Sequence, residues 1–166
     1  MVEAQHGLDL AYELQELPGL VSGGIFTAIG TYEVGDLLMM LDLLSQRLEV
    51  STDELMKVYG QHLFGRFVTL FPDLFVGRSD SLDFIASIEG TIHIEVLKLY
   101  PEAELPYFDQ VYEGDTLVMT YNSVRPMASF AEGLVRGCLE HFGDGREYTR
   151  EDIGNRDGTR AVFRIR

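Results

Sequence analysis

The chain has 166 residues, 46% of them hydrophobic and 24% charged, which is long enough to bury a core as a single domain over residues 1–166. Acidic residues outnumber basic ones by 27 to 13, and the formal net charge of −14 disfavours binding to nucleic acid or to an anionic membrane surface. The one cysteine, Cys138, excludes an internal disulfide framework and a multi-cysteine zinc site. The longest apolar stretch, residues 37–41, is too short to span a membrane. Because the start of the chain also lacks a signal-peptide pattern, we expect a cytoplasmic location.

The first half of the chain is predicted to be helical. Apolar residues recur at helical spacing over residues 8–17 and again over residues 32–48, which is typical of amphipathic helices. Ser51 followed by Glu54 is a capping-box signature that opens a third helix. Pro72 interrupts the helical pattern, so we expect the third helix to end just before it.

A longer helix is predicted over residues 80–100. Apolar residues from Phe84 to Leu99 recur at intervals of three and four, which corresponds to about five helical turns with one apolar stripe. Pro101 follows directly and ends the pattern.

The second half alternates between strands and one helix. Two predicted strands flank the turn Glu113-Gly114-Asp115, one helix follows, and two further strands complete the chain. These segments are residues 107–112, 116–123, 128–142, 146–153 and 159–165. The predicted fold class is therefore α+β, with a helical lobe over residues 1–79 and a second lobe over residues 80–166, in which a four-stranded antiparallel sheet packs on helices.

Two features of the sequence could carry chemistry, and the first is His93. It lies in the middle of the otherwise apolar helix, where a histidine is usually a core or boundary residue with its hydrogen bonds satisfied. His93 by itself therefore does not identify a metal site. Motifs typical of hydrolases and phosphate-binding loops are absent from the sequence, and Cys138 is best interpreted as a small buried hydrophobic residue.

The second feature is the segment that contains Tyr121, Ser123 and Arg125. Side chains two residues apart share one face of a strand, so we expect a phenol, a hydroxyl and a guanidinium to be presented together. All three side chains donate hydrogen bonds, and the arginine guanidinium can bind a carboxylate through two of its N–H groups. The pattern favours a receptor for an anionic oxygen group, and the alternative is the polar face of a half-exposed strand.

Taken together, the two segments resemble a known family. Residues 93–101 follow the pattern H-x-x-V-x-x-x-Y-P, and residues 121–125 follow Y-x-S-x-R; both patterns are characteristic of the H-NOX family, the haem-nitric oxide/oxygen-binding domains. The resemblance covers most of the chain and extends to residues 30–32, 58–75 and 130–142. It implies that haem b, iron protoporphyrin IX, lies between a helical distal lobe and a proximal lobe, with His93 as the iron ligand.

The resemblance also implies roles for residues around the haem. Tyr121, Ser123 and Arg125 correspond to the clamp that docks the two propionates. Pro106 corresponds to a proline that contacts and shapes the porphyrin, and Leu134 corresponds to an apolar residue of the distal pocket. Members that bind dioxygen stably carry a tyrosine five residues after the motif arginine, whereas this chain has Phe130 there, so the resemblance implies the class selective for nitric oxide.

The function implied by the resemblance is that of a gas sensor without enzymatic activity. It would bind nitric oxide at ferrous haem, with carbon monoxide as a further ligand, and signal in trans to a partner such as a histidine kinase or a cyclic-di-GMP enzyme. Two alternatives stay open: a haem-free scaffold or interaction module of the same fold, and a haem enzyme such as a peroxidase. The enzyme needs distal acid–base groups, whereas Phe130 and Leu134 are apolar.

Overall fold

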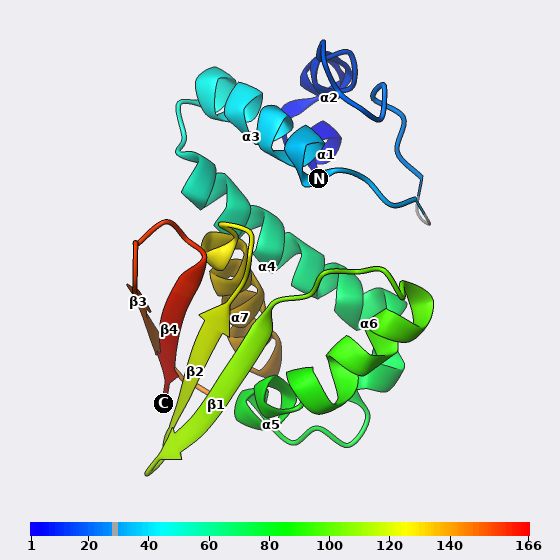
Figure 1. Ribbon diagram of the computed structural model, residues 1–166. Helices are drawn as coiled ribbons and strands as arrows, with labels where there is room; N and C mark the ends of the chain where they lie inside the picture. Colours follow the sequence, from blue (N-terminus) through cyan, green and yellow to red (C-terminus); the bar gives the residue numbers. More distant parts are fainter. Residues whose placement is uncertain (28–29) are drawn as a thin grey trace. The chain divides into compact units, whose positions relative to one another are not determined.

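The computed structural model describes residues 1–27 and 30–166 (Figure 1). Its helices are α1 (Val2–His6), α2 (Leu8–Gln15), α3 (Val34–Leu48), α4 (Thr52–Leu70), η1 (Pro72–Phe75), α5 (Ser81–Ala86), η2 (Ile88–Ile92), α6 (His93–Leu99) and α7 (Ala128–Phe142), and its strands are β1 (Tyr107–Glu113), β2 (Thr116–Asn122), β3 (Tyr148–Asp152) and β4 (Arg160–Ile165). The predicted α+β fold class is confirmed. Among the helices of the described residues, none is long and apolar enough to cross a membrane.

The chain divides into two compact units, Met1–Met56 and Lys57–Arg166. In the first unit, α2 and α3 form where the sequence predicts them. The first turn of α3 carries the buried carboxylate of Asp36, which accepts hydrogen bonds from the backbone N–H groups of Val21 at 2.8 Å and Ser22 at 2.9 Å. This carboxylate therefore fixes the loop that follows α2 to the start of α3.

Helix α4 begins as the capping signature predicts, because the Glu54 N–H donates to the Ser51 hydroxyl at 3.2 Å. The boundary between the two compact units falls within this helix, between Met56 and Lys57, and the lobe boundary expected between residues 79 and 80 stays a prediction. The reason for the boundary at Lys57 is close packing of α4 on α7: a Cβ atom on Gly133 would lie 2.1 Å from the Lys57 carbonyl oxygen, and one on Gly60 would lie 2.3 Å from the Phe130 carbonyl oxygen. From Lys57 onward, α4 therefore belongs to the unit that contains the sheet.

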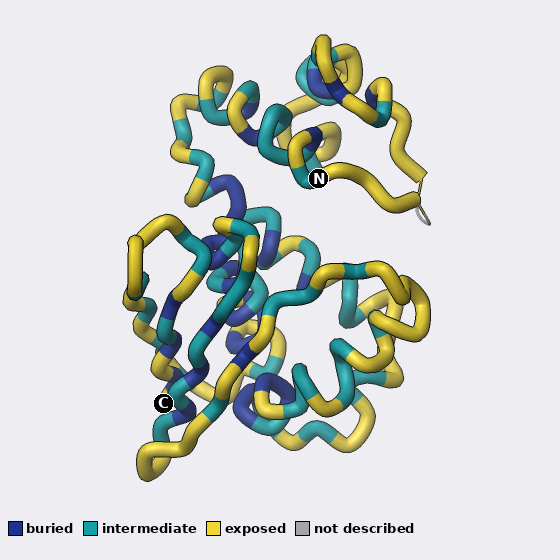
Figure 2. Tube along the Cα trace, viewed as in Figure 1, coloured by how far each residue is buried: buried dark blue, intermediate teal, exposed yellow. Residues whose placement is uncertain are grey.

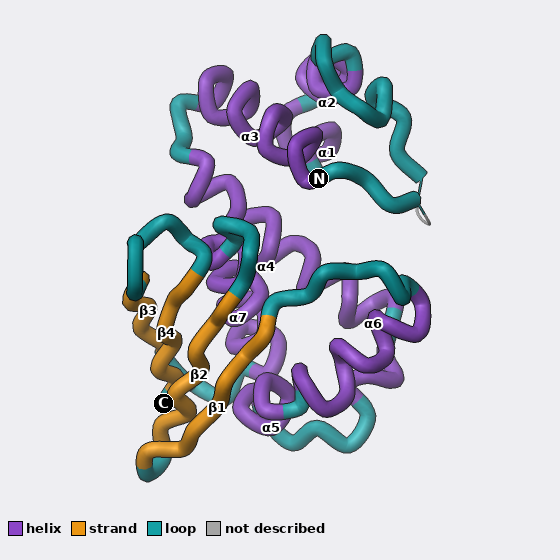
Figure 3. The backbone as a smooth tube through the Cα atoms, in the orientation of Figure 1, coloured by secondary structure: helices purple, strands orange, loops and turns teal. Residues whose placement is uncertain are grey.

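The sheet has the strand order β1-β2-β4-β3, and every neighbouring pair is antiparallel. Strands β1 and β2 join through a two-residue turn in which Gly114 adopts a positive φ of 60°, as hairpin turns require. Buried residues concentrate along β2, β4, α5 and α7 (Figure 2). Figure 3 shows these helices and strands in the same orientation. The most deeply buried hydrophobic residues of this core are Ile85, Leu117, Met119, Tyr121, Ala128, Cys138, Ala161, Phe163 and Ile165. This core holds the sheet and α7 together and leaves β1 as an edge strand.

The segment predicted as one helix over residues 80–100 is three helical pieces. A wide π-helical turn, η2, separates α5 from α6, and within it the Ile92 N–H donates to the Ser87 carbonyl at 3.4 Å, five residues back. The Ser87 hydroxyl also donates to the Phe84 carbonyl at 2.7 Å, a local bond that competes with regular helical bonding. Apolar spacing of three and four does not distinguish an α-helix from one that contains such a turn. Four residues of α5 are buried and none of α6 is.

Candidate haem-binding site

His93 is the first residue of α6 and follows directly on the π-helical turn. Its side chain is 15% exposed, its Nδ1 lies 3.2 Å from Glu89 Oε1, and its ring lies 5.7 Å from the ring of Phe108. Burial lowers the pKa of His93, although the nearby Glu89 carboxylate acts in the opposite direction. The resulting neutral imidazole is the form that ligates haem iron, and π-helical turns are frequent at functional sites.

Glu89 is a site residue that the sequence analysis missed. The same Oε1 that faces His93 accepts a hydrogen bond from the backbone N–H of Phe108 at 2.8 Å. The available signal was the spacing, since an acid four residues before a histidine on a helix lies beside it. Without the tertiary structure, however, nothing indicated that this carboxylate also binds the edge strand β1.

Tyr121 and Ser123 are arranged differently from the expectation. Strand β2 ends at Asn122, so the alternation of faces does not continue to Arg125. The three residues meet instead because the chain folds back: the Tyr121 hydroxyl donates to the Arg125 carbonyl at 3.4 Å, and the Arg125 N–H donates to the Ser123 hydroxyl at 3.0 Å. Tyr121 is buried, and its ring lies 5.6 Å from that of Phe108. The phenol and hydroxyl thus hold the backbone that carries the guanidinium.

Arg125 binds a carboxylate in this structure. Its guanidinium forms an ion pair with the side chain of Glu104 and also donates to the Glu104 carbonyl at 3.1 Å. Pro106 lies two residues after Glu104 and directly precedes β1, whose first residue, Tyr107, pairs with Asn122 of β2. Glu104, Pro106 and the clamp segment therefore lie at the same end of the sheet. The donor set fits a haem: a neutral imidazole for the iron and a guanidinium that already takes a carboxylate, the chemistry of a propionate.

Phe130 and Leu134 lie on α7, the helix on which the sequence predicts them. The ring of Phe130 lies 5.5 Å from that of Tyr59 on α4, and Leu134 packs, partly buried, against the core. Burial raises the pKa of the Tyr59 phenol. The sequence carried no signal for the contact between Tyr59 and Phe130, because the contact depends on the close packing of α4 on α7.

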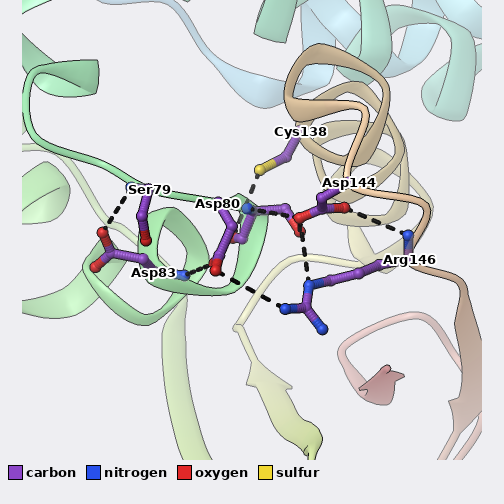
Figure 4. A network of polar contacts seen from close by, with 7 residues as sticks. Ser79, Asp80, Asp83, Cys138, Asp144 and Arg146 are labelled. Carbon is purple, nitrogen blue, oxygen red and sulfur yellow. Dashed lines mark hydrogen bonds and ion pairs between the residues drawn. The ribbon is translucent and has the colours of Figure 1, made fainter.

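The N-terminal end of α5 is fixed by a polar network (Figure 4). Asp144, in the loop after α7, accepts hydrogen bonds from Ser81 and also contacts Arg146 at 3.3 Å. Asp80 caps α5 by accepting from the Asp83 N–H at 2.9 Å. Cys138 is buried next to the Ser81 carbonyl, and burial raises the pKa of its thiol, so it is the small buried residue that the sequence predicts.

The fold first defines a class: the chain is an α+β domain whose four-stranded antiparallel sheet packs on helices. A family model described as Haem-NO-binding matches residues 1–149, and the chain belongs to this H-NOX family of haem-based gas sensors.

Solved structures agree with this membership. The chain is 38% identical to the H-NOX protein from K. algicida, solved in the Fe(II) unliganded state, with a TM-score of 0.91 over 99% of this chain and 89% of that chain. It is 25% identical to an H-NOX protein from S. oneidensis in the Fe(II)NO state, with a TM-score of 0.88. The match covers 100% of this chain and 92% of that chain. It is 36% identical to the IWP-051-bound H-NOX from Shewanella woodyi in the Fe(II)CO state, with a TM-score of 0.83. The match covers 99% of this chain and 87% of that chain. A comparison with curated proteins found no match.

Proposed function

We propose that this chain binds haem b through His93 and senses nitric oxide at the ferrous iron, with carbon monoxide as a further ligand. The observation that carries the proposal is the environment of His93, a neutral, mostly buried imidazole whose Nδ1 faces a carboxylate. This arrangement leaves Nε2 as the ligand atom. The relatives from S. oneidensis and Shewanella woodyi were solved with nitric oxide and carbon monoxide respectively.

The clamp assignment follows from the bonds of Arg125. In the proposed haem-bound state, the guanidinium exchanges the Glu104 carboxylate for a propionate. Tyr121 and Ser123 keep the Arg125 backbone in place through their hydroxyl groups. Pro106 restricts the backbone between Glu104 and β1 and contacts the porphyrin. Bound haem supplies the iron that takes the gas, while these residues orient and retain it.

Selectivity for nitric oxide is proposed from the residues assigned to the distal side. Phe130 and Leu134 are apolar and have no hydrogen-bond donor to offer. Bound dioxygen needs such a donor because its bond to iron is polarised, whereas nitric oxide binds ferrous haem strongly without one. The ring of Tyr59 on the neighbouring helix α4 lies 5.5 Å from the ring of Phe130.

The output is proposed to be a signal in trans, in the cytoplasm, to a partner protein such as a histidine kinase or a cyclic-di-GMP enzyme. His93 begins the less buried α6, and η2 separates it from the anchored α5. A change at the His93–iron bond would therefore be expressed mainly in η2 and α6. The net charge of −14 favours a partner with a basic surface.

A Soret spectrum of the reduced protein, with and without nitric oxide, tests the proposal. We expect a haem spectrum that shifts with nitric oxide, loss or imidazole-dependence of haem loading in His93→Gly, and normal loading in the control His62→Gly, since His62 is exposed on α4. The alternative is a haem-free scaffold of the same fold, in which Arg125 keeps its ion pair with Glu104. Absence of a haem spectrum would support that alternative, and an unchanged spectrum in His93→Gly would contradict the ligand assignment.

A further inference from the structure

We propose that Glu89 is the positioning residue of the haem ligand: its carboxylate holds the proton of His93 on Nδ1, directs Nε2 to the iron and strengthens the iron–histidine bond. This inference rests on the proposed role of His93 and adds to it. It assigns a residue that sets how tightly the iron is held, and therefore how readily the bond opposite the gas can break.

The geometry shows a carboxylate that is held in place. One oxygen, Oε1, lies 2.8 Å from the Phe108 backbone nitrogen and 3.2 Å from His93 Nδ1. Phe108 belongs to the edge strand β1, whose one partner strand among residues 1–27 and 30–166 is β2. The Phe108 N–H donates to the Glu89 carboxylate instead of to a neighbouring strand. Because the strand anchors this oxygen, Glu89 cannot turn away from His93 without leaving a backbone donor unpaired.

The chemistry follows from what each group can donate. A carboxylate only accepts hydrogen bonds, and a neutral imidazole has one N–H, so the proton lies on Nδ1 and the lone pair on Nε2. An anionic acceptor on the far nitrogen also increases the electron density of the ring and its basicity toward a metal. The wide turn η2 places Glu89 and His93 on consecutive helical pieces, so the carboxylate and the ligand are positioned by the same local structure.

The same helical segment offers a matched control. Glu95 lies two residues after His93, and its carboxylate pairs with Lys98 Nζ at 2.6 Å. Glu95→Gln therefore removes one negative charge near the site without removing the hydrogen bond to Nδ1. Effects of Glu89 substitutions that Glu95→Gln does not reproduce are due to that hydrogen bond rather than to the overall field.

Resonance Raman spectra of the ferrous unliganded protein test the proposal directly. We expect the iron–histidine stretching frequency to fall in Glu89→Gln, which keeps an acceptor but loses its charge, and to fall further in Glu89→Ala. Haem dissociation from Glu89→Ala should be faster by about tenfold to a hundredfold. Glu95→Gln should match the unmodified protein. Unchanged frequencies in both Glu89 variants would overturn the proposal.

A second measurement separates this inference from the proposed function. In the haem-free full chain, nitrogen NMR of His93 should show the proton on Nδ1, and Glu89→Ala should shift it toward Nε2. Exchange of the Phe108 amide reports the merely structural role: faster exchange with an unchanged tautomer and unchanged Raman spectrum would reject the positioning role. If His93→Gly kept a normal haem spectrum, the ligand assignment would fail, whereas the tautomer result would still decide whether Glu89 orders the ring.

Discussion

The carboxylate of Asp144 accepts two hydrogen bonds from Ser81, one from its hydroxyl at 2.6 Å and one from its backbone N–H at 3.0 Å. The pair joins the start of α5 to the loop after α7, and Arg146 completes it at 3.3 Å from Asp144. The segment that carries His93 is thus tied down at one end, while α6 at the other end contains no buried residue.

This asymmetry predicts where a nitric oxide signal appears. Hydrogen exchange on the ferrous protein, with and without nitric oxide, should change in η2 and α6 and change little in α5, because α5 is buried and anchored. The change should accompany a spectrum of five-coordinate haem, in which the His93–iron bond is broken. A spectral change with no altered exchange from Ile88 to Leu99 would show that the signal leaves the haem by another route.

The Ser81–Asp144 pair also predicts a dependence of stability on pH. Burial alone would raise the pKa of Asp144, but the hydrogen bonds from Ser81 and the charge of Arg146 outweigh it and lower the pKa below the ordinary value. Such a group contributes stability above the pKa of the unfolded chain, about 3.9, and this contribution is lost as the pH falls through the lower folded value. Urea unfolding at pH 7 and at pH 3 should therefore show a smaller pH effect in Asp144→Asn than in the unmodified protein.

At neutral pH, Asp144→Asn should lower the free energy of unfolding by about 1.5–3 kcal/mol, because hydrogen bonds to a charged acceptor are lost. Asp115→Asn, in the exposed turn between β1 and β2, is the control and should change little. An equal pH effect in the unmodified protein and in Asp144→Asn would contradict the assignment.

The clamp predicts two substitutions with different outcomes. Arg125→Ala removes a charge-assisted bond worth about 1.5–3 kcal/mol, so haem affinity should fall by roughly tenfold to a hundredfold. Glu104→Gln removes the carboxylate that competes for the same guanidinium, so haem affinity should be maintained or increased. Haem transfer to an acceptor protein measures both. Unchanged dissociation in Arg125→Ala, or faster dissociation in Glu104→Gln, would reject the clamp.

The close packing of α4 on α7 predicts that a side chain at position 133 lowers the stability of the fold. The Cβ of Gly133→Ala would lie 2.1 Å from the Lys57 carbonyl oxygen, so the helices must separate, and overpacking of this kind costs about 1–3 kcal/mol or more. Gly65→Ala on α4 is the matched control, because its Cβ would meet nothing within 4 Å, and it should stabilise the helix by up to about 1 kcal/mol. Thermal unfolding of the two variants should therefore shift in opposite directions.

The contact between Tyr59 and Phe130 predicts how selectivity can change. The reduced protein should bind nitric oxide and carbon monoxide and form no stable oxygen complex in air. Phe130→Tyr places a donor at the position where oxygen-binding relatives carry one and should create measurable oxygen binding. Tyr59→Phe should leave the spectra of the reduced protein with nitric oxide, with carbon monoxide and in air the same as those of the unmodified protein. A stable oxygen complex in the unmodified protein that disappears in Tyr59→Phe would show that Tyr59 is the distal donor.

Local patterns in the sequence predicted most of the secondary structure. Periodicity defined α3 and α7, Ser51 marked the start of α4, and the turn at Gly114 defined the hairpin, because these features depend on neighbours a few residues apart. The two motifs around His93 and Tyr121 indicated the family that the comparison then confirmed. Residue type and spacing were sufficient to indicate the family, because both motifs are defined by particular side chains at fixed separations.

The tertiary structure decided how these residues are used. It divided the helix over residues 80–100 by a π-helical turn, because a local bond from Ser87 competes with the regular pattern. It folded the segment after β2 so that Tyr121 and Ser123 support Arg125 rather than stand beside it. It also brought Glu89 onto both His93 and β1. The bonds of Ser87 and of the segment after β2 join residues only two to four apart, and periodicity does not distinguish them from regular spacing. The bond between Glu89 and the Phe108 N–H joins segments 19 residues apart, a separation that carries no periodic signal, so it is fixed only when the core packs.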